Sequence, residues 1–304
     1  MRMKHKSTLL LMLGVMAPTC FMAYFGQEHS SARATGQRLE HSNAEAFSST
    51  GKQHRALLVE GSIEAPEHQI DPTVFRPLGP KAYQISRLDD ARPPGDAIAY
   101  VQNLIPRSEA GDSLATFNIY LALTDCQNYL TKDPYRMAAV EVPGDAMLAN
   151  LEKIERKISE CAPLSLEHEI TQKKWLEIAA RQGSIEAKIY YSINPNSIIG
   201  DGTERLANPI KVDEWKERSL LYLREAAGTG NLDAIARLSS AHENGIIAEH
   251  SPVLAYAYAL TANRIKPDSV GRAWIQNMED TLSNRERETA ASLARSIYQS
   301  CCTL

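Results

Sequence analysis

Several absences in this sequence of 304 residues limit what the protein can be. The formal net charge is only −4, with neither a basic block nor a long acidic tail, so nothing indicates a nucleic-acid-binding surface. The sequence has no G-x-S-x-G elbow and no P-loop. It has no C-x-x-C pair, and His242-Glu243 lacks the second histidine of a zinc-protease motif because position 246 is isoleucine. We therefore expect no catalytic residue, no cofactor and no metal.

The N-terminus predicts export. Arg2, Lys4 and Lys6 precede an uncharged apolar run, residues 8–25, which is the layout of a signal peptide or a signal anchor within residues 1–26. The length of the run favours an uncleaved anchor. A cleaved signal peptide and a lipoprotein modified at Cys20 are the alternatives. Each places the rest of the chain in the periplasm or on the extracytoplasmic face of a bacterial inner membrane, with residues 8–25 in that membrane if they are not cleaved.

Residues 27–90 predict a disordered linker rich in proline and serine. The first half has no apolar periodicity, and Pro66, Pro72, Pro77 and Pro80 exclude a continuous helix. We expect this linker to hold a folded domain, residues 91–304, away from the membrane.

The folded part is marked by a phrase that occurs twice. Residues 175–187 and 222–234 share the pattern aromatic-Leu-x-x-Ala-Ala-x-x-Gly-x-x-x-Ala. Such self-similarity is typical of a solenoid, in which each unit buries its apolar face only against its neighbours. Glycine permits the turn between two helices, and small alanines let the helices approach closely. The positions of the phrase that we expect to have a structural role in the repeat are Trp175, Ala179, Gly183, Ala187, Tyr222, Ala226, Gly230 and Ala234.

Other signals agree with a helical domain. Gly111 and Ala115 lie 72 residues, or two units of 36, before Gly183 and Ala187. Ser251-Pro252 is typical of a helix start, and residues 283–286 have capping-box spacing. The sequence therefore predicts an all-α fold.

The two copies of the phrase resemble the Sel-one-like repeat, a relative of the tetratricopeptide repeat. The resemblance covers two copies well and two more weakly, between about residues 94 and 282. It implies a right-handed α-solenoid of antiparallel helix pairs that serves as an adaptor or scaffold for a protein or peptide partner. The family has no catalytic residues to carry over. This chain departs from the family pattern in residues 194–209, where we expect a long loop. The alternative function is an exported hydrolase or cell-envelope enzyme with an unrecognised active site.

Cysteines and tyrosines supply the remaining candidates. Cys126 and Cys161 each lie on an apolar helical stripe, so we expect them to form a structural disulfide in an oxidising compartment. We expect Cys301 and Cys302 to pair elsewhere or to stay free near a frayed terminus. A strained ring between the two, a metal site and a bridge between two chains are the alternatives. We expect most tyrosines of the repeat helices to fill the core between helices, and three of them are candidates for the alternative role of partner binding: Tyr190, Tyr191 and Tyr256.

Overall fold

The structure is a computed structural model that describes residues 70–87, 91–141 and 146–303, all within one compact unit. The predicted export segment, residues 1–26, and residues 27–69 of the predicted linker lie outside the described residues. Within the described ranges, no helix combines the length and the apolar character needed to cross a bilayer.

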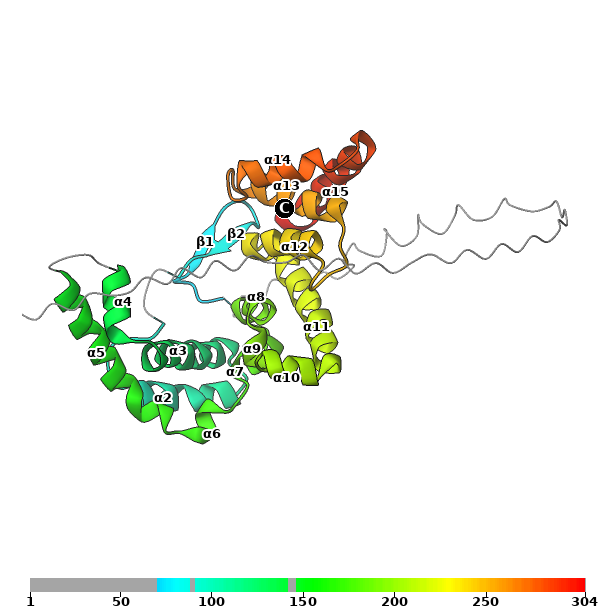
Figure 1. Cartoon of the computed structure of the whole chain (residues 1–304). Coiled ribbons are helices and arrows are strands. Elements are labelled where there is room, and N and C mark those ends of the chain that lie inside the picture. Colours follow the sequence, from blue (N-terminus) through cyan, green and yellow to red (C-terminus); the bar gives the residue numbers. More distant parts are fainter. Residues whose placement is uncertain (1–69, 88–90, 142–145, 304) are drawn as a thin grey trace, which may run out of the picture. The chain divides into compact units, whose positions relative to one another are not determined.

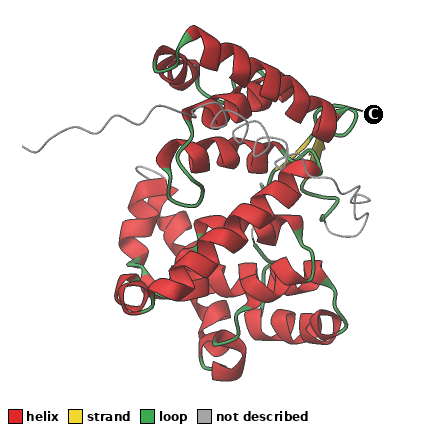
Figure 2. Ribbon diagram, turned by 90° about the vertical axis from the view of Figure 1, so that its right-hand side faces the viewer, coloured by secondary structure: helices red, strands yellow, loops and turns green. Residues whose placement is uncertain are grey.

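Helices form nearly all of the regular structure (Figure 2). They begin with α2 (Ala97–Glu109), α3 (Ser113–Thr131), α4 (Pro134–Glu141), α5 (Ala146–Ser165), α6 (His168–Thr171), α7 (Trp175–Arg181) and α8 (Ile185–Ile193). They continue with α9 (Pro195–Ile199), α10 (Gly202–Ala207), α11 (Pro209–Gly228), α12 (Leu232–Asn244), α13 (Pro252–Ile265), α14 (Arg272–Asp280) and α15 (Asn284–Cys302). The all-α prediction is confirmed.

The same corner joins the helices of three pairs: α2 to α3, α7 to α8, and α11 to α12. Each corner contains a glycine with a positive φ, namely Gly111 (93°), Gly183 (105°) and Gly230 (87°). The residue after the glycine caps the second helix of the pair with its side chain, and the residue after that one begins the helix. A residue with a Cβ would be strained at the glycine, so the glycine–cap dipeptide dictates the reversal of the chain. The capping residues are Asp112, Ser184 and Asn231.

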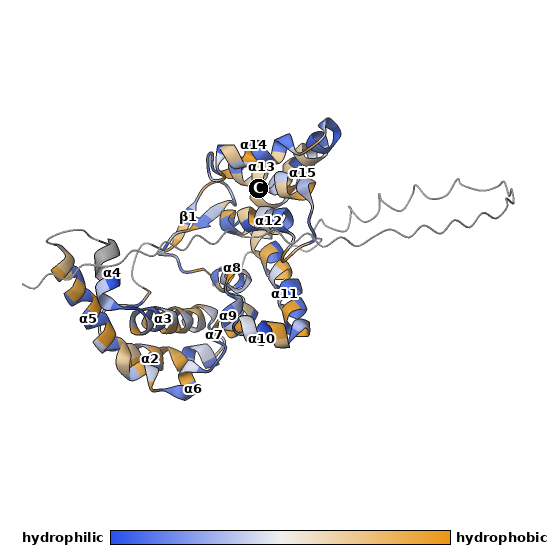
Figure 3. Cartoon of the chain, viewed as in Figure 1, coloured by the Kyte–Doolittle hydropathy of each residue, from blue (hydrophilic) through white to orange (hydrophobic). Residues whose placement is uncertain are grey.

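Each helix packs against helices that lie near it in the chain order. α3 packs on α5 and α7, α8 on α11, α12 on α13, and α13 on α15, which is the nearest-neighbour packing of a solenoid. Ala179, Ala187, Ala226 and Ala234 are fully buried at the close approaches between these helices. Hydrophilic and hydrophobic residues alternate along α5 and α11 (Figure 3), as expected of helices with one buried face. The predicted solenoid of antiparallel helix pairs is therefore present.

The structure corrects two expectations about irregular segments. Residues 194–209 are not a long loop, because they contain the short helices α9 and α10, and Asp201 and Glu204 form a capping box that begins α10. Residues 70–87 are not a disordered linker. They contain a hairpin of β1 (Phe75–Pro77) and β2 (Tyr83–Ile85), which lies beside α12 (Figure 1).

The edge of the hairpin formed by β1 offers few groups for pairing with a further strand. β1 and β2 are antiparallel, with Arg76 opposite Gln84. Pro77 has no N–H to offer a further strand, and the Arg76 guanidinium donates to the Phe75 carbonyl at 3.0 Å. Few backbone groups of this edge are therefore free to pair with another chain.

The predicted disulfide is confirmed: Cys126 of α3 bonds to Cys161 of α5, and both residues are buried. The expectation for the last two cysteines is wrong. Cys301 bonds to Cys302, and both are buried because α15 extends through them and packs into the core.

Candidate interaction surface

The most distinctive surface of the unit is the one that holds residues 70–87, which we call the strap. At the hairpin, the Tyr83 backbone N–H donates to the Gly230 carbonyl at 3.1 Å. The Tyr83 hydroxyl forms a 2.7 Å hydrogen bond with Thr229 Oγ1. Tyr83 is only 3% exposed, and burial raises its pKa to about 12. The corner between α11 and α12 therefore binds the hairpin through its own backbone.

The strap makes further polar contacts beyond this corner. The Ile85 backbone N–H donates to Asp233 of α12 at 3.3 Å. Lys266, which follows α13, donates to the Gln84 side chain at 2.9 Å. Burial raises the pKa of Asp233 above its ordinary value, and the hydrogen bond from the Ile85 backbone N–H opposes that shift. The Nε of Arg237 on α12 is buried and has no hydrogen-bond partner among the described residues.

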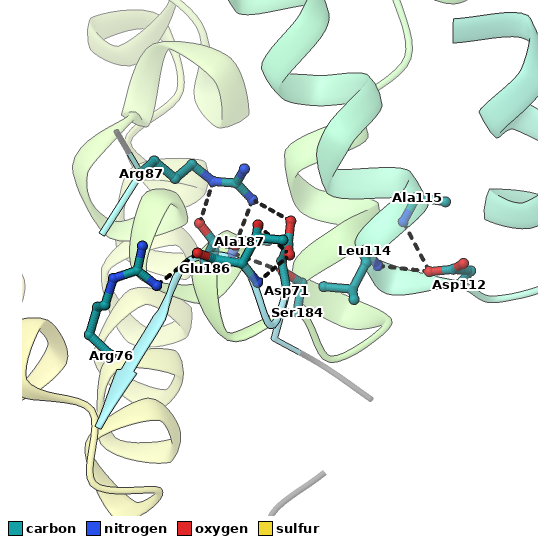
Figure 4. Close-up of polar contacts among 10 residues, drawn as sticks. Asp71, Arg76, Arg87, Asp112, Leu114, Ala115, Ser184, Glu186 and Ala187 are labelled. Atoms are coloured by element: carbon teal, nitrogen blue, oxygen red, sulfur yellow. Dashed lines mark hydrogen bonds and ion pairs between the residues drawn. The ribbon is translucent and has the colours of Figure 1, made fainter. Parts of the chain in front are cut away.

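The end of the strap carries a buried ion pair (Figure 4). Arg87 Nε donates to Glu186 Oε1 at 2.7 Å, and Arg87 Nη2 donates to Glu186 Oε2 at 2.8 Å. Asp71, at the other end of the strap, lies 4.0 Å from the same guanidinium. The Glu186 side chain is 2% exposed and that of Arg87 is 22% exposed. This bidentate pair ties the strap to α8 at a point where water is largely excluded.

Opposing effects act on the charges of this pair. Burial raises the pKa of Glu186 above its ordinary value, and the Arg87 guanidinium offsets part of that shift. Burial also works against the charge of Arg87, but Glu186 outweighs it and raises the pKa of Arg87. Ser184 caps α8 two residues earlier, so Glu186 lies in the first turn, where the helix dipole favours a carboxylate. The local sequence thus positions the acid and the strap supplies its counter-ion.

Aromatic rings surround the ion pair. The Arg87 guanidinium lies 5.7 Å from the centre of the Phe117 ring of α3. Tyr190, one turn after Glu186 on α8, meets Phe117 edge to face at 5.4 Å and Tyr120 at 6.4 Å. We call the surfaces of α3, α8 and α12 that contact the strap the strap-binding face.

The predicted partner-binding tyrosines occupy different environments. Tyr190 is half-buried beside the ion pair. Tyr191 and Tyr256 are only 6% and 7% exposed, so they fill the core, as we expect for most of the repeat tyrosines, and offer little surface to a partner. Tyr191 packs edge to face on Tyr222 at 5.2 Å and accepts, through its carbonyl, a hydrogen bond from the Trp215 indole.

The residues that hold the strap are not marked by any local pattern of the sequence. Arg87 stands in a segment without periodicity, and its partner lies 99 positions later, so no local pattern pairs them. One signal was present: Glu186 lies between Ile185 and Ala187 at the start of a helix with few polar residues. An acid among buried neighbours predicts a counter-ion from elsewhere in the chain.

The described residues offer little else for chemistry. None of them forms a group of three or more histidine, cysteine or acidic residues that could hold a metal. His242 stacks on Tyr258, and its Nδ1 lies 3.0 Å from the Glu249 carbonyl. Burial lowers the pKa of His242, which favours its neutral form. A hollow beside Cys126 has walls of Leu123, Leu130 and Leu164.

Comparisons with known proteins leave the family open. No family model matches the chain, and no curated protein matches it. A solved structure with which it aligns is a protective antigen present in uropathogenic Escherichia coli strains that displays an SLR fold. The two are 16% identical, and the TM-score is 0.29. The alignment covers 68% of this chain and 57% of the antigen, so the chain spans less than two thirds of that protein's length.

Proposed function

We propose that this protein is an exported or membrane-tethered helical-repeat adaptor that binds a protein or peptide partner. The observation that carries the proposal is that the helix array already binds an extended segment, the strap. It does so with a backbone hydrogen bond to Tyr83, a carboxylate for the backbone of Ile85 and a bidentate acid for Arg87. These are the means by which proteins recognise extended peptides: main-chain groups give affinity, and side-chain sites give specificity.

We also propose that the protein acts by presenting a surface rather than by bond chemistry. The buried acid beside the aromatic cluster, Glu186, is neutralised by a guanidinium at hydrogen-bond distance, an arrangement suited to recognition. The location proposed from the sequence is the periplasm or the outer side of the inner membrane. A buried disulfide between α3 and α5 fits an oxidising compartment.

Site-directed photo-crosslinking in the cell envelope tests this function. Phe75 is 38% exposed, and its ring lies 4.9 Å from that of Tyr83, so a benzoylphenylalanine there reports on a partner at the strap. Tyr135, on α4, is 63% exposed and serves as the matched control. We expect a discrete crosslinked protein with the probe at position 75 and none at position 135. Equal labelling at both positions, or labelling at neither, would contradict the proposal.

A further inference from the structure

The strap is held in two unequal parts. The hairpin is built into the core, because Val74, Ala82 and Tyr83 are each 5% exposed or less. The end at Arg87 is held chiefly by polar contacts: the Arg87 side chain stays 22% exposed, and it is attached through Glu186 and Asp71. The two parts can therefore separate, with the hairpin as the anchor and the Arg87–Glu186 pair as a latch.

Opening the latch without a replacement is unfavourable. Glu186 is almost completely buried, and a buried carboxylate without its cation loses both its charge partner and its two hydrogen bonds. Exchange of one guanidinium for another avoids that cost. An arginine fits the site better than a lysine, because the two nitrogen–oxygen contacts are bidentate and the guanidinium plane also lies beside the Phe117 ring.

We propose that Arg87 is an intramolecular stand-in for a partner's arginine. The partner is an extended peptide that presents an arginine to Glu186, displaces the latch and leaves the hairpin in place. This inference rests on the proposed function, because it names the chemistry of the peptide that the adaptor binds. The strap thereby makes the free protein self-inhibited, and specificity for arginine comes from Glu186.

Trypsin tests the latch in the full-length protein, because it must draw the Arg87 side chain away from Glu186 before it cuts the Arg87–Leu88 bond. We expect Glu186→Gln to speed that cleavage tenfold or more, measured by mass spectrometry, while cleavage at Lys81–Ala82 in the hairpin keeps its wild-type rate. Glu225→Gln is the control, because it removes the 2.8 Å ion pair between Lys188 and Glu225 without touching the strap. Equal acceleration of both bonds in Glu186→Gln, or of neither, would overturn the inference.

A second measurement tests the exchange itself. The probe is acetyl-Ile-Ser-Arg-Leu-amide, which has the sequence of residues 85–88, and its control carries uncharged citrulline in place of arginine. At millimolar concentration, we expect the arginine peptide to raise the melting temperature of Arg87→Ala and not that of Arg87→Ala/Glu186→Gln. We expect a smaller rise in the wild type, whose latch competes. Equal effects of the two peptides on Arg87→Ala, or no effect of either, would overturn the exchange.

The two tests separate this inference from the proposed function. A latch that opens and accepts the arginine peptide, together with no crosslinked partner at position 75, contradicts the adaptor function alone. A crosslinked partner at position 75, together with unchanged cleavage at Arg87 in Glu186→Gln and no effect of the arginine peptide on melting, contradicts this inference alone.

Discussion

Replacing Arg87 by alanine tests the ion pair that holds the end of the strap on α8. The substitution leaves Glu186 buried, with 2% of its side chain exposed, and without the guanidinium that donates to both of its oxygens. Removing one partner of a buried pair costs about 3–5 kcal/mol. Because 22% of the Arg87 side chain is exposed, some water reaches the site, and we expect a loss of about 3 kcal/mol, the lower end of that range.

Urea denaturation followed by circular dichroism measures this loss, with Arg76→Ala as the control. Arg76 is exposed and donates to the backbone carbonyls of Thr73 and Phe75, so its removal should cost less than about 1 kcal/mol. The double variant Arg87→Met/Glu186→Leu should recover much of the stability, because apolar residues of similar size leave no unpaired charge. A loss below about 1 kcal/mol in Arg87→Ala would refute our view that the pair is tightly coupled.

The same variant has a predictable pH dependence. Burial already raises the pKa of Glu186 above 4.5, and removal of the Arg87 cation raises it further. A carboxyl whose pKa is higher in the folded state binds a proton more readily there, so its penalty is present at neutral pH and shrinks as the pH falls through that pKa. The difference between wild type and Arg87→Ala should therefore narrow from pH 7.5 toward pH 5. A constant or growing difference would refute the assignment of the penalty to an uncompensated Glu186.

Three further predictions concern the framework. Cys126→Ser should lower the free energy of unfolding under oxidising conditions by about 4 kcal/mol in the chain-entropy model, given the sequence separation of 35, and melting equal to wild type would contradict a structural role. Gly230→Ala should destabilise more than Gly111→Ala in thermal melts, because both glycines have positive φ but only at 230 would a Cβ lie 2.4 Å from the Lys81 carbonyl oxygen. Equal losses of melting temperature in the two variants would contradict this prediction, because they would show that the hairpin moves away from the added Cβ at little cost. Tyr256→Ala should cost about 3 kcal/mol because the ring is buried, whereas Tyr135→Ala, at an exposed site, should change stability by less than about 0.5 kcal/mol.

Short-range signals in the sequence were sufficient for the helix pairs. The glycine–cap dipeptides at 183–184 and 230–231 define the corners through positive φ and a side-chain cap, and both properties belong to the residues themselves. Ser251 and the Ser283–Glu286 box begin α13 and α15 for the same reason. The Cys126–Cys161 bond followed from two helical stripes that had to face a common core.

The strap could not be predicted in this way because its contacts are non-local. Tyr83 bonds to Thr229 across 146 positions, and Arg87 bonds to Glu186 across 99. Prolines exclude a helix but leave an extended segment free to be disordered or to pack. Here Ala82 and Tyr83 pack because the corner at Gly230 leaves room for the backbone at Lys81.

The strap also affects whether parts of the helix array can unfold independently of one another. In a simple solenoid each unit contacts only its neighbours, so stability is a sum of local terms and the ends can open independently. Here one core cluster contains Phe117 and another contains Ala82. The strap places Ala82 in the second cluster and, through Arg87, lies against Phe117 of the first. The helices α8 and α11 also contribute buried residues to both clusters, so the latch adds to a coupling that these helices already provide. A partner that displaces Arg87 from Glu186 would therefore loosen the coupling between the clusters as it binds.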